Sequence, residues 1–302
     1  MACIPLICRA QAQAPSLLIG MHVVTLLENP DWSLAPQGER LDIYRAVKAA
    51  GIEAIQCRDA DVAREAGLIP TAFGRVDTPA QALEIARFGK GEGFIATTLH
   101  VGSGFEADAE SANLVAAIID ASIQENYPLF IETHRATITQ DMKRTLDLVQ
   151  QFPEIRFNGD FSHWYTGQEM PYGDIDEKFE RLTPVTRRTC FIHGRVSAPG
   201  AMQIPVDEEH LAPHVAVFRK FWQRCFIGFL QNAKPGDCFG FFPELLPASF
   251  HYARLIKDEQ GNLREECDRW QQAFLIIDIA RQCWDSALQS LTVASKSAEV
   301  SA

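Results

Sequence analysis

The sequence is short of basic residues: 28 Lys and Arg stand against 39 Asp and Glu, giving a formal net charge of -11. That charge repels phosphate backbones, so we expect no nucleic-acid partner. Long apolar runs are missing as well, since no stretch approaches the roughly 18 uninterrupted apolar residues of a membrane span. We therefore expect no membrane partner either.

Paired cysteine motifs and a secretion signal are also absent. The eight cysteines include no CxxC pair and follow no regular spacing, a pattern typical of reduced thiols in a cytoplasmic protein. The opening stretch "MACIPLICRAQAQAPSLLIG" has no charged segment before its apolar part, and Arg9 interrupts it, which argues against a signal peptide. The sequence thus favours a cytoplasmic location.

No linker rich in Gly, Ser or Pro divides the 302 residues, so we expect one domain. We place an N-terminal extension at 1–15, the domain at 16–290, and a flexible tail at 291–302, where the residues are small and polar. The phosphate-binding fingerprint of dinucleotide folds is missing too, because "GSG" at 102–104 is only a fragment of GxGxxG. That absence weighs against a doubly wound open sheet.

What the chain does contain is an alternation of short apolar runs with helical segments. Apolar residues on both faces of a strand indicate parallel strands covered by helices, and right-handed crossovers curl such a sheet one way. Eight runs are the number that closes a barrel, so we predict an α/β fold, a single-domain (β/α)8 TIM barrel. The runs cover 16–24, 52–57, 67–73, 94–101, 128–133, 155–160, 189–196 and 238–244.

The stretch from Leu263 to Leu288 predicts one long C-terminal helix with an apolar stripe, interrupted by Arg281. Such a stripe would pack against the outer ring of the barrel or against another subunit, so a homo-oligomer is compatible with the sequence. The stripe consists of Leu263, Cys267, Trp270, Phe274, Ile277, Trp284 and Leu288.

Polar residues follow the apolar runs, where the catalytic groups of a barrel lie at the carboxyl ends of its strands. The fourth to eighth runs end in His100, then Glu132 with His134, Asp160 with His163, His193 with Arg195, and finally Glu244.

Glu132, Asp160, His193 and Glu244 come one from each of the last four predicted strands. Three carboxylates in one pocket repel each other, and a divalent cation resolves that conflict. An oxygen-rich set with one imidazole suits Mn²⁺, Mg²⁺ or Co²⁺, and a catalytic Zn²⁺ is also compatible.

Each residue also has an ordinary structural interpretation. Glu132 alone could cap a helix or lie at the surface, and His193 alone is more often a hydrogen-bonded core histidine. Glu244 lies in a proline-bounded apolar segment, where an unpaired carboxylate costs several kcal/mol to bury. It therefore needs a partner.

The stretch "IRFNGDFSHWY" at 155–165 permits two interpretations. Asn158-Gly159 is a strong hairpin signal, which would make the sixth strand antiparallel. The alternative is a local bend or bulge at the end of a parallel strand that turns Asp160 into the pocket. Agreement with the other seven runs favours the bend.

Five motifs resemble those of the xylose isomerase-like barrel superfamily, in particular its sugar phosphate isomerase/epimerase branch. They are "TLHVGSGF" (98–105), "FIETHR" (130–135), "GDFSHW" (159–164), "FIHGRV" (191–196) and "FFPELLP" (241–247). The resemblance spans about 17–255 and departs from the family at "PELLP", where Pro-Glu-Phe-Gly-Pro is common.

This resemblance implies an enzyme that binds a divalent metal through Glu132, Asp160, His193 and Glu244. Glu132 and Glu244 would also move a proton on a sugar or hydroxy-keto substrate through an enediolate. His163 and Arg195 would contact the substrate. His100 and His134 would contact it or support the ligands.

Two other functions remain open from the sequence. Apurinic endonucleases of the same superfamily share several of these positions, but "RVSAPGAMQIPVDEEH" lacks their Asp-x-His pair, and DNA demands a basic face. The third interpretation is a barrel that binds a metal or small ligand without isomerase activity, or that catalyses another metal-assisted reaction such as dehydration.

Overall fold

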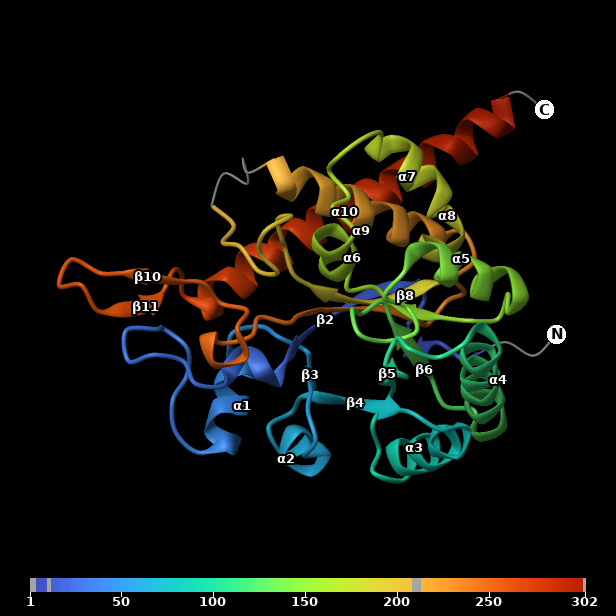
Figure 1. The fold of residues 1–302 in the computed structure, drawn as a ribbon. Coiled ribbons are helices and arrows are strands. Elements are labelled where there is room, and N and C mark those ends of the chain that lie inside the picture. Colours follow the sequence, from blue (N-terminus) through green and yellow to red (C-terminus); the bar gives the residue numbers. More distant parts are fainter. Residues whose placement is uncertain (1–3, 10–11, 208–212, 301–302) are drawn as a thin grey trace.

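The computed structural model describes residues 4–9, 12–207 and 213–300, and within these ranges the chain forms a closed parallel barrel surrounded by helices (Figure 1). Hydrogen bonding follows the order β2, β3, β4, β5, β6, β7, β8, β9, and β9 returns to β2 to close the circle. The barrel strands are β2 (Ser16–His22), β3 (Ala54–Gln56), β4 (Ile69–Val76), β5 (Thr97–Val101), β6 (Leu129–Glu132), β7 (Phe157–Asn158), β8 (Thr189–Gly194) and β9 (Asp237–Pro243).

Every predicted apolar run overlaps one of these strands, and the predicted (β/α)8 TIM barrel is confirmed. The strands are apolar on both faces because helices cover the outside and side chains fill the inside. All six residues of β8 are buried. In the interior, a Cβ on Gly20 would lie 2.1 Å from the Phe242 ring, so only glycine fits opposite that aromatic.

Helices alternate with the strands on the outside of the barrel. At the start of α3, the Gln81 side chain accepts from the Thr78 N–H at 2.9 Å, and Pro79 occupies the first turn. The helices are η1 (Val23–Leu26), α1 (Arg40–Ala49), α2 (Ala60–Glu65), α3 (Pro79–Gly91), α4 (Asp108–Glu125), α5 (Met142–Gln151), α6 (Ser162–Gly167), α7 (Ile175–Arg181), α8 (Thr183–Thr186), α9 (Pro213–Leu230), η2 (Ala248–Phe250) and α10 (Arg269–Val300).

The Asn158-Gly159 stretch is not a hairpin. β7 pairs in parallel with both β6 and β8, and its register to β8 shifts between Phe157 and Asn158. A Cβ on Gly159 would lie 2.6 Å from the Phe161 ring, so the glycine permits a close approach at the bend. The bend leads directly to Asp160.

The predicted long helix begins later than expected. Leu263 lies in a hairpin of β10 (Leu255–Lys257) and β11 (Leu263–Glu265), and its side chain is 65% exposed. The turn forms because Asp258 accepts from the Gln260 and Asn262 N–H groups and Gly261 takes a left-handed φ of +86°. The helix starts only after Asp268, whose side chain accepts from the Trp270 N–H.

From Arg269 onward, α10 packs on the outside of the barrel against α9 and β9. Trp284 contacts the rings of Phe226 and Phe239, at 5.3 and 6.5 Å between centroids. Leu288, at the end of the predicted stripe, is 41% exposed. The helix continues to Val300, so residues 291–300 of the expected flexible tail are helical.

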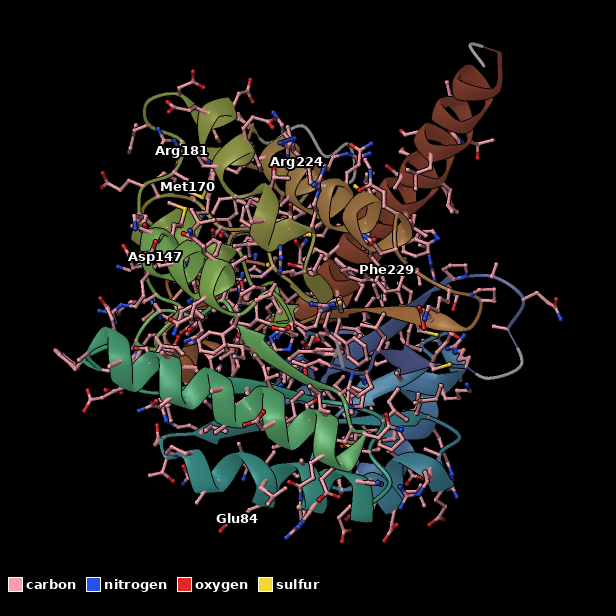
Figure 2. The ribbon with its side chains drawn as sticks, turned by 90° about the vertical axis from the view of Figure 1, so that its right-hand side faces the viewer. Glu84, Asp147, Met170, Arg181, Arg224 and Phe229 are labelled. Carbon is pink, nitrogen blue, oxygen red and sulfur yellow. The ribbon has the colours of Figure 1, made fainter. Side chains whose placement is uncertain are left out.

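The N-terminal extension contributes a short strand. β1 (Ile7–Cys8) pairs antiparallel with β9, next to the strand that closes the barrel. In Figure 2 the Glu84 side chain on α3 points away from the barrel. None of the described helices is both long and apolar enough to cross a membrane.

Candidate functional site

The carboxyl ends of β6 to β9 bring four predicted residues together. Glu132 ends β6, Asp160 follows the β7 bend, His193 lies near the end of β8, and Glu244 directly follows β9. One ligand atom from each lies within 4.8 Å of those of the other three. Glu132, Asp160 and His193 are at most 2% exposed, and the Glu244 side chain is 13% exposed.

One carboxylate oxygen of Glu132 accepts a hydrogen bond, and the other has no hydrogen-bond partner among the described residues. Its Oε2 accepts from the Asn158 amide at 3.1 Å and lies 3.3 Å from His193 Nδ1. Its Oε1 is buried and has no hydrogen-bond partner among the described residues. Burial raises the pKa of Glu132, but the charges of His193 and His100 outweigh burial and hold that pKa well below its usual value.

Asp160 is fully buried and ionised. Its Oδ1 accepts from the Ser162 N–H at 3.1 Å, and its Oδ2 accepts from Arg195 Nη2 at 2.6 Å. Burial opposes ionisation, but the charges of Arg195 and His163 lower the pKa of Asp160 far below its usual value. These neighbours therefore favour the ionised form of the carboxylate.

The tautomer of His193 follows from its neighbours. The Gln56 amide nitrogen donates to the Ala72 carbonyl and to Thr98 Oγ1, so its oxygen faces His193 and accepts from Nε2 at 2.6 Å. This leaves His193 Nδ1 facing Glu132 and Glu244 at 3.3 and 3.5 Å. Burial lowers the pKa of His193, but the two glutamates raise it to about 9. Nδ1 thus has a strong tendency to hold a proton or a cation.

Arg195 links two of the carboxylates. Its Nη2 donates to Asp160 at 2.6 Å and to Glu244 at 2.5 Å, and the side chain is 1% exposed. Its Nε and Nη1 are buried without a partner among the described residues. The guanidinium lies 4.7 Å from the centre of the Tyr252 ring.

Three histidine rings lie next to one another beside Glu132, tilted relative to each other. The His134 ring lies 4.0 Å from that of His100 and 3.7 Å from that of His163. His134 Nδ1 donates to the Arg135 carbonyl, which leaves Nε2 without the proton. His100, Glu132 and His134 form a second group whose ligand atoms lie within 4.8 Å of each other. The predicted substrate-side residues His100, His134, His163 and Arg195 therefore all border the four-residue group.

Sequence reasoning missed four residues of this site. His22 ends β2 with its Nε2 3.6 Å from Glu244, and Gln56 ends β3 against His193. Both are polar residues near the ends of the first two apolar runs, which was the signal that identified the later residues. Asn158 is the last residue of β7, and Tyr252 comes from a loop with no pattern.

The four-residue group fits a divalent cation. It presents three carboxylates, an imidazole Nδ1 turned toward two of them, and one buried carboxylate oxygen without a partner. Hard oxygen donors with one imidazole are the set that Mn²⁺, Mg²⁺, Co²⁺ or a catalytic Zn²⁺ accepts.

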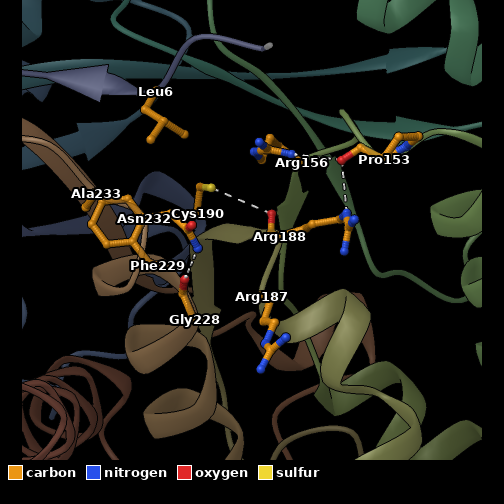
Figure 3. A pocket seen from close by; sticks show the side chains of 10 residues that line it. All are labelled: Leu6, Pro153, Arg156, Arg187, Arg188, Cys190, Gly228, Phe229, Asn232 and Ala233. Atoms are coloured by element: carbon orange, nitrogen blue, oxygen red, sulfur yellow. Dashed lines mark hydrogen bonds between the residues drawn. The ribbon is translucent and has the colours of Figure 1, made fainter. Parts of the chain in front are cut away.

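A separate cavity of about 400 Å³ lies at the opposite end of the barrel (Figure 3). Arg156 precedes β7 and Arg188 precedes β8, so both are at the amino ends of their strands. Both guanidiniums donate to the Pro153 carbonyl, at 3.4 and 3.0 Å. None of the predicted site residues lines this cavity.

No protein-family model matches the chain, and no curated protein matches its sequence. Among solved structures, it is similar to a sugar phosphate isomerase/epimerase from Parabacteroides distasonis, with 10% identity, a TM-score of 0.51, and coverage of 91% of this chain and 95% of that one. The two chains share the barrel fold.

Two other solved structures superpose less well. A xylose isomerase domain protein from Planctomyces limnophilus is 14% identical over 78% of this chain and 91% of that one, with a TM-score of 0.42. The probable 3-DHS dehydratase AsbF from Bacillus anthracis is 18% identical over 62% and 74%, with a TM-score of 0.43.

Proposed function

We propose that this chain is a metal-dependent isomerase or epimerase of the xylose isomerase-like superfamily that moves a proton on a small sugar or hydroxy-keto compound. The observation that carries the proposal is the convergence of Glu132, Asp160, His193 and Glu244 at the carboxyl ends of four successive strands. The shared barrel fold and the motif resemblance support the same reaction class.

The same four residues would hold the cation, with His193 binding through Nδ1 because Gln56 occupies Nε2. When bound, a divalent cation supplies Lewis-acid polarisation of neighbouring substrate oxygens, which acidifies the carbon-bound hydrogen between them.

Glu132 and Glu244 are the proposed proton-transfer groups. Asn158 fixes Glu132 through Oε2 and leaves Oε1 to accept a proton. Glu244 is fixed by Arg195 on Oε2, with His22 near its Oε1. His22 Nδ1 accepts from the Val24 N–H, so its proton is on the nitrogen that faces Glu244. Both carboxylates are thus oriented before the substrate arrives.

His163 and Arg195 are the proposed substrate contacts, with His100 and His134 beside them. Both ring nitrogens of His163 are buried without a hydrogen-bond partner among the described residues, although Nε2 lies 3.4 Å from Asp160, and Arg195 has two unused donors. Substrate hydroxyl and carbonyl oxygens would satisfy these groups, and the burial of these side chains would limit the access of water to the enediolate.

The test combines metal analysis of the purified protein with solvent-deuterium exchange into a panel of ketoses and 2-keto acids. We expect about one tightly bound divalent ion per chain and exchange that is lost in Glu132→Gln and Glu244→Gln. Glu84→Gln is the matched control, because Glu84 is exposed on the outer face of α3 (Figure 2).

Other outcomes would favour the other functions. Metal binding without exchange on any compound would favour a binding protein or another metal-assisted enzyme such as a dehydratase. The group of His100, Glu132 and His134 is the observation that favours a hydrolase, because it could hold a second ion. Two ions per chain together with cleavage of abasic DNA would replace the isomerase proposal.

A further inference from the structure

Resting on the proposed function, we infer that the substrate carries an anionic group, and that Arg195 and Arg135, on either side of Tyr252, bind it. This goes beyond the reaction class, because a neutral ketose and a sugar acid or sugar phosphate could undergo the same proton transfer. Three observations carry the inference: unused buried donors, an unpaired second arginine, and the charge of the site.

The unused donors belong to Arg195. It contacts Asp160 and Glu244 only through Nη2, although its side chain is 1% exposed. Its Nε and Nη1 have no acceptor among the described residues. A buried charged donor without an acceptor is costly, so the site is complete only when acceptor oxygens occupy this space.

The second arginine is Arg135, in the loop after β6. Its guanidinium lies 5.0 Å from the centre of the Tyr252 ring, while that of Arg195 lies 4.7 Å from the same ring. Tyr252 also lies edge-on to His163, with 6.5 Å between the ring centres. The tyrosine therefore joins an exposed arginine at the mouth to a buried arginine beside the catalytic carboxylates.

Arg135 differs from most surface arginines of this chain. Arg75 and Arg254, for example, each pair with a nearby carboxylate. Arg135 forms no ion pair with any described residue, although the sequence holds 39 acidic residues. A cation held over an aromatic ring at the entrance to a site is available to an incoming anion.

The charges of the occupied site point the same way. Glu132, Asp160 and Glu244 are negative, while Arg195, Arg135 and a divalent cation are positive. With neutral imidazoles this leaves one net positive charge. A substrate with one negative charge balances it, and a neutral substrate does not.

Equilibrium binding to the metal-loaded full chain tests the inference without requiring turnover. The probes are sorbitol, gluconate and sorbitol 6-phosphate, which share a polyol chain and cannot enolise. We expect at least one anion to bind about tenfold or more tightly than sorbitol. Whichever anion binds identifies the group as a carboxylate or a phosphate.

Binding measurements on variants then test whether Arg135 and Tyr252 form the anion site. Arg135→Gln should weaken binding of the favoured anion about tenfold and leave sorbitol binding unchanged. Arg264→Gln is the matched control, because Arg264 is exposed and lies over Trp32 instead of Tyr252. Tyr252→Ala should resemble Arg135→Gln, because it removes the ring over which the Arg135 guanidinium lies.

Equal binding of all three probes, or anion binding that Arg135→Gln does not change, would overturn the inference. These results are separate from the deuterium-exchange test of the proposed function. Anion binding through Arg135 with no exchange on any substrate would support the anion site and contradict the proposed isomerase activity. Exchange on neutral ketoses alone would support the proposed isomerase activity and contradict the anion site.

Discussion

Arginine side chains lie at both ends of the barrel, but their hydrogen bonds differ. At the amino ends of the strands, Arg188 donates to the Pro153 and Pro184 carbonyls at 3.0 and 2.9 Å. Arg156 donates to the Glu154 and Ile155 carbonyls, both at 2.9 Å. At the carboxyl ends, Arg195 donates hydrogen bonds only to carboxylates and keeps two buried nitrogens without acceptors among the described residues.

This difference in hydrogen bonding distinguishes arginines that stabilise the fold from an arginine available to a ligand. At the amino ends, Arg156 and Arg188 donate to backbone carbonyls of the segments before β7 and β8. These side chains therefore stabilise the path of the backbone there. At the carboxyl ends, like charges gather and donors stay unused, which a folded protein tolerates where a ligand completes the arrangement. The cavity at the amino ends, where backbone carbonyls accept from Arg156 and Arg188, and the carboxylate group, where Arg195 keeps unused donors, therefore have different roles.

The largest expected effect is at the carboxyl ends. Glu132→Gln should lower the exchange rate about a thousandfold, since a positioned general base contributes roughly 10²–10⁴. Because His193 and His100 hold the pKa of Glu132 below its usual value, its charge stabilises the folded state, so the substitution should also lower the free energy of unfolding of the metal-free protein at neutral pH. Deuterium-exchange assays and urea unfolding measure the two quantities. An active variant, or one whose free energy of unfolding does not fall, would contradict the role given to Glu132.

Arg195→Met should destabilise the metal-free protein by about 3 kcal/mol, because Asp160 and Glu244 lose their buried cation. Adding Mn²⁺ should recover part of this loss, since the metal supplies positive charge to the same carboxylates. Urea unfolding with and without Mn²⁺ measures the difference. A loss that Mn²⁺ leaves unchanged would mean that these carboxylates are not metal ligands.

At the other end of the barrel, Arg188→Gln should cost about 1 kcal/mol of unfolding free energy, because it removes bonds to two backbone carbonyls. Metal content and exchange rate should stay unchanged. Urea unfolding, metal analysis and the deuterium-exchange assay measure these three quantities. A loss of activity with normal stability would show that this end also serves the reaction, and the distinction between the two ends would fail.

The smallest effect concerns the thiol in the cavity. Burial raises the pKa of Cys190 to about 12, so at pH 8 almost none of it is thiolate. We expect iodoacetamide to label the exposed Cys8 well before Cys190 in the folded protein. Peptide mass spectrometry over a time course checks the order. Early labelling of Cys190 would show that the barrel opens readily at the amino ends of its strands.

The barrel could be predicted from the sequence because its strands are buried on both faces. The strands within "FIATTLHV" and "PLFIET" are almost entirely buried, and the polar residues near their ends, His100 and Glu132, lie at the mouth. The proposed ligands were predictable for the same reason, since chain order fixes strand order in such a fold.

The remaining features depend on contacts that sequence spacing does not encode. Leu263 continued an apolar stripe, but the turn at Asp258 and Gly261 placed it in a hairpin instead. Tyr252 reaches the two arginines through the loop after β9, whose path is fixed by packing across the mouth. The unused donors of Arg195 become visible only when every neighbouring acceptor has a position.

The seam between β2 and β9 has a consequence for how the protein is made. The Leu245 N–H donates to Thr25 Oγ1, 220 residues earlier, and His22 faces Glu244 across the same seam. The first and last strands meet only after nearly all of the chain has left the ribosome. Because domains emerge N-terminus first and such distant pairings form slowly, the complete carboxylate group assembles last. Metal uptake would then follow barrel closure, and the time at which it begins would report that closure in a refolding experiment.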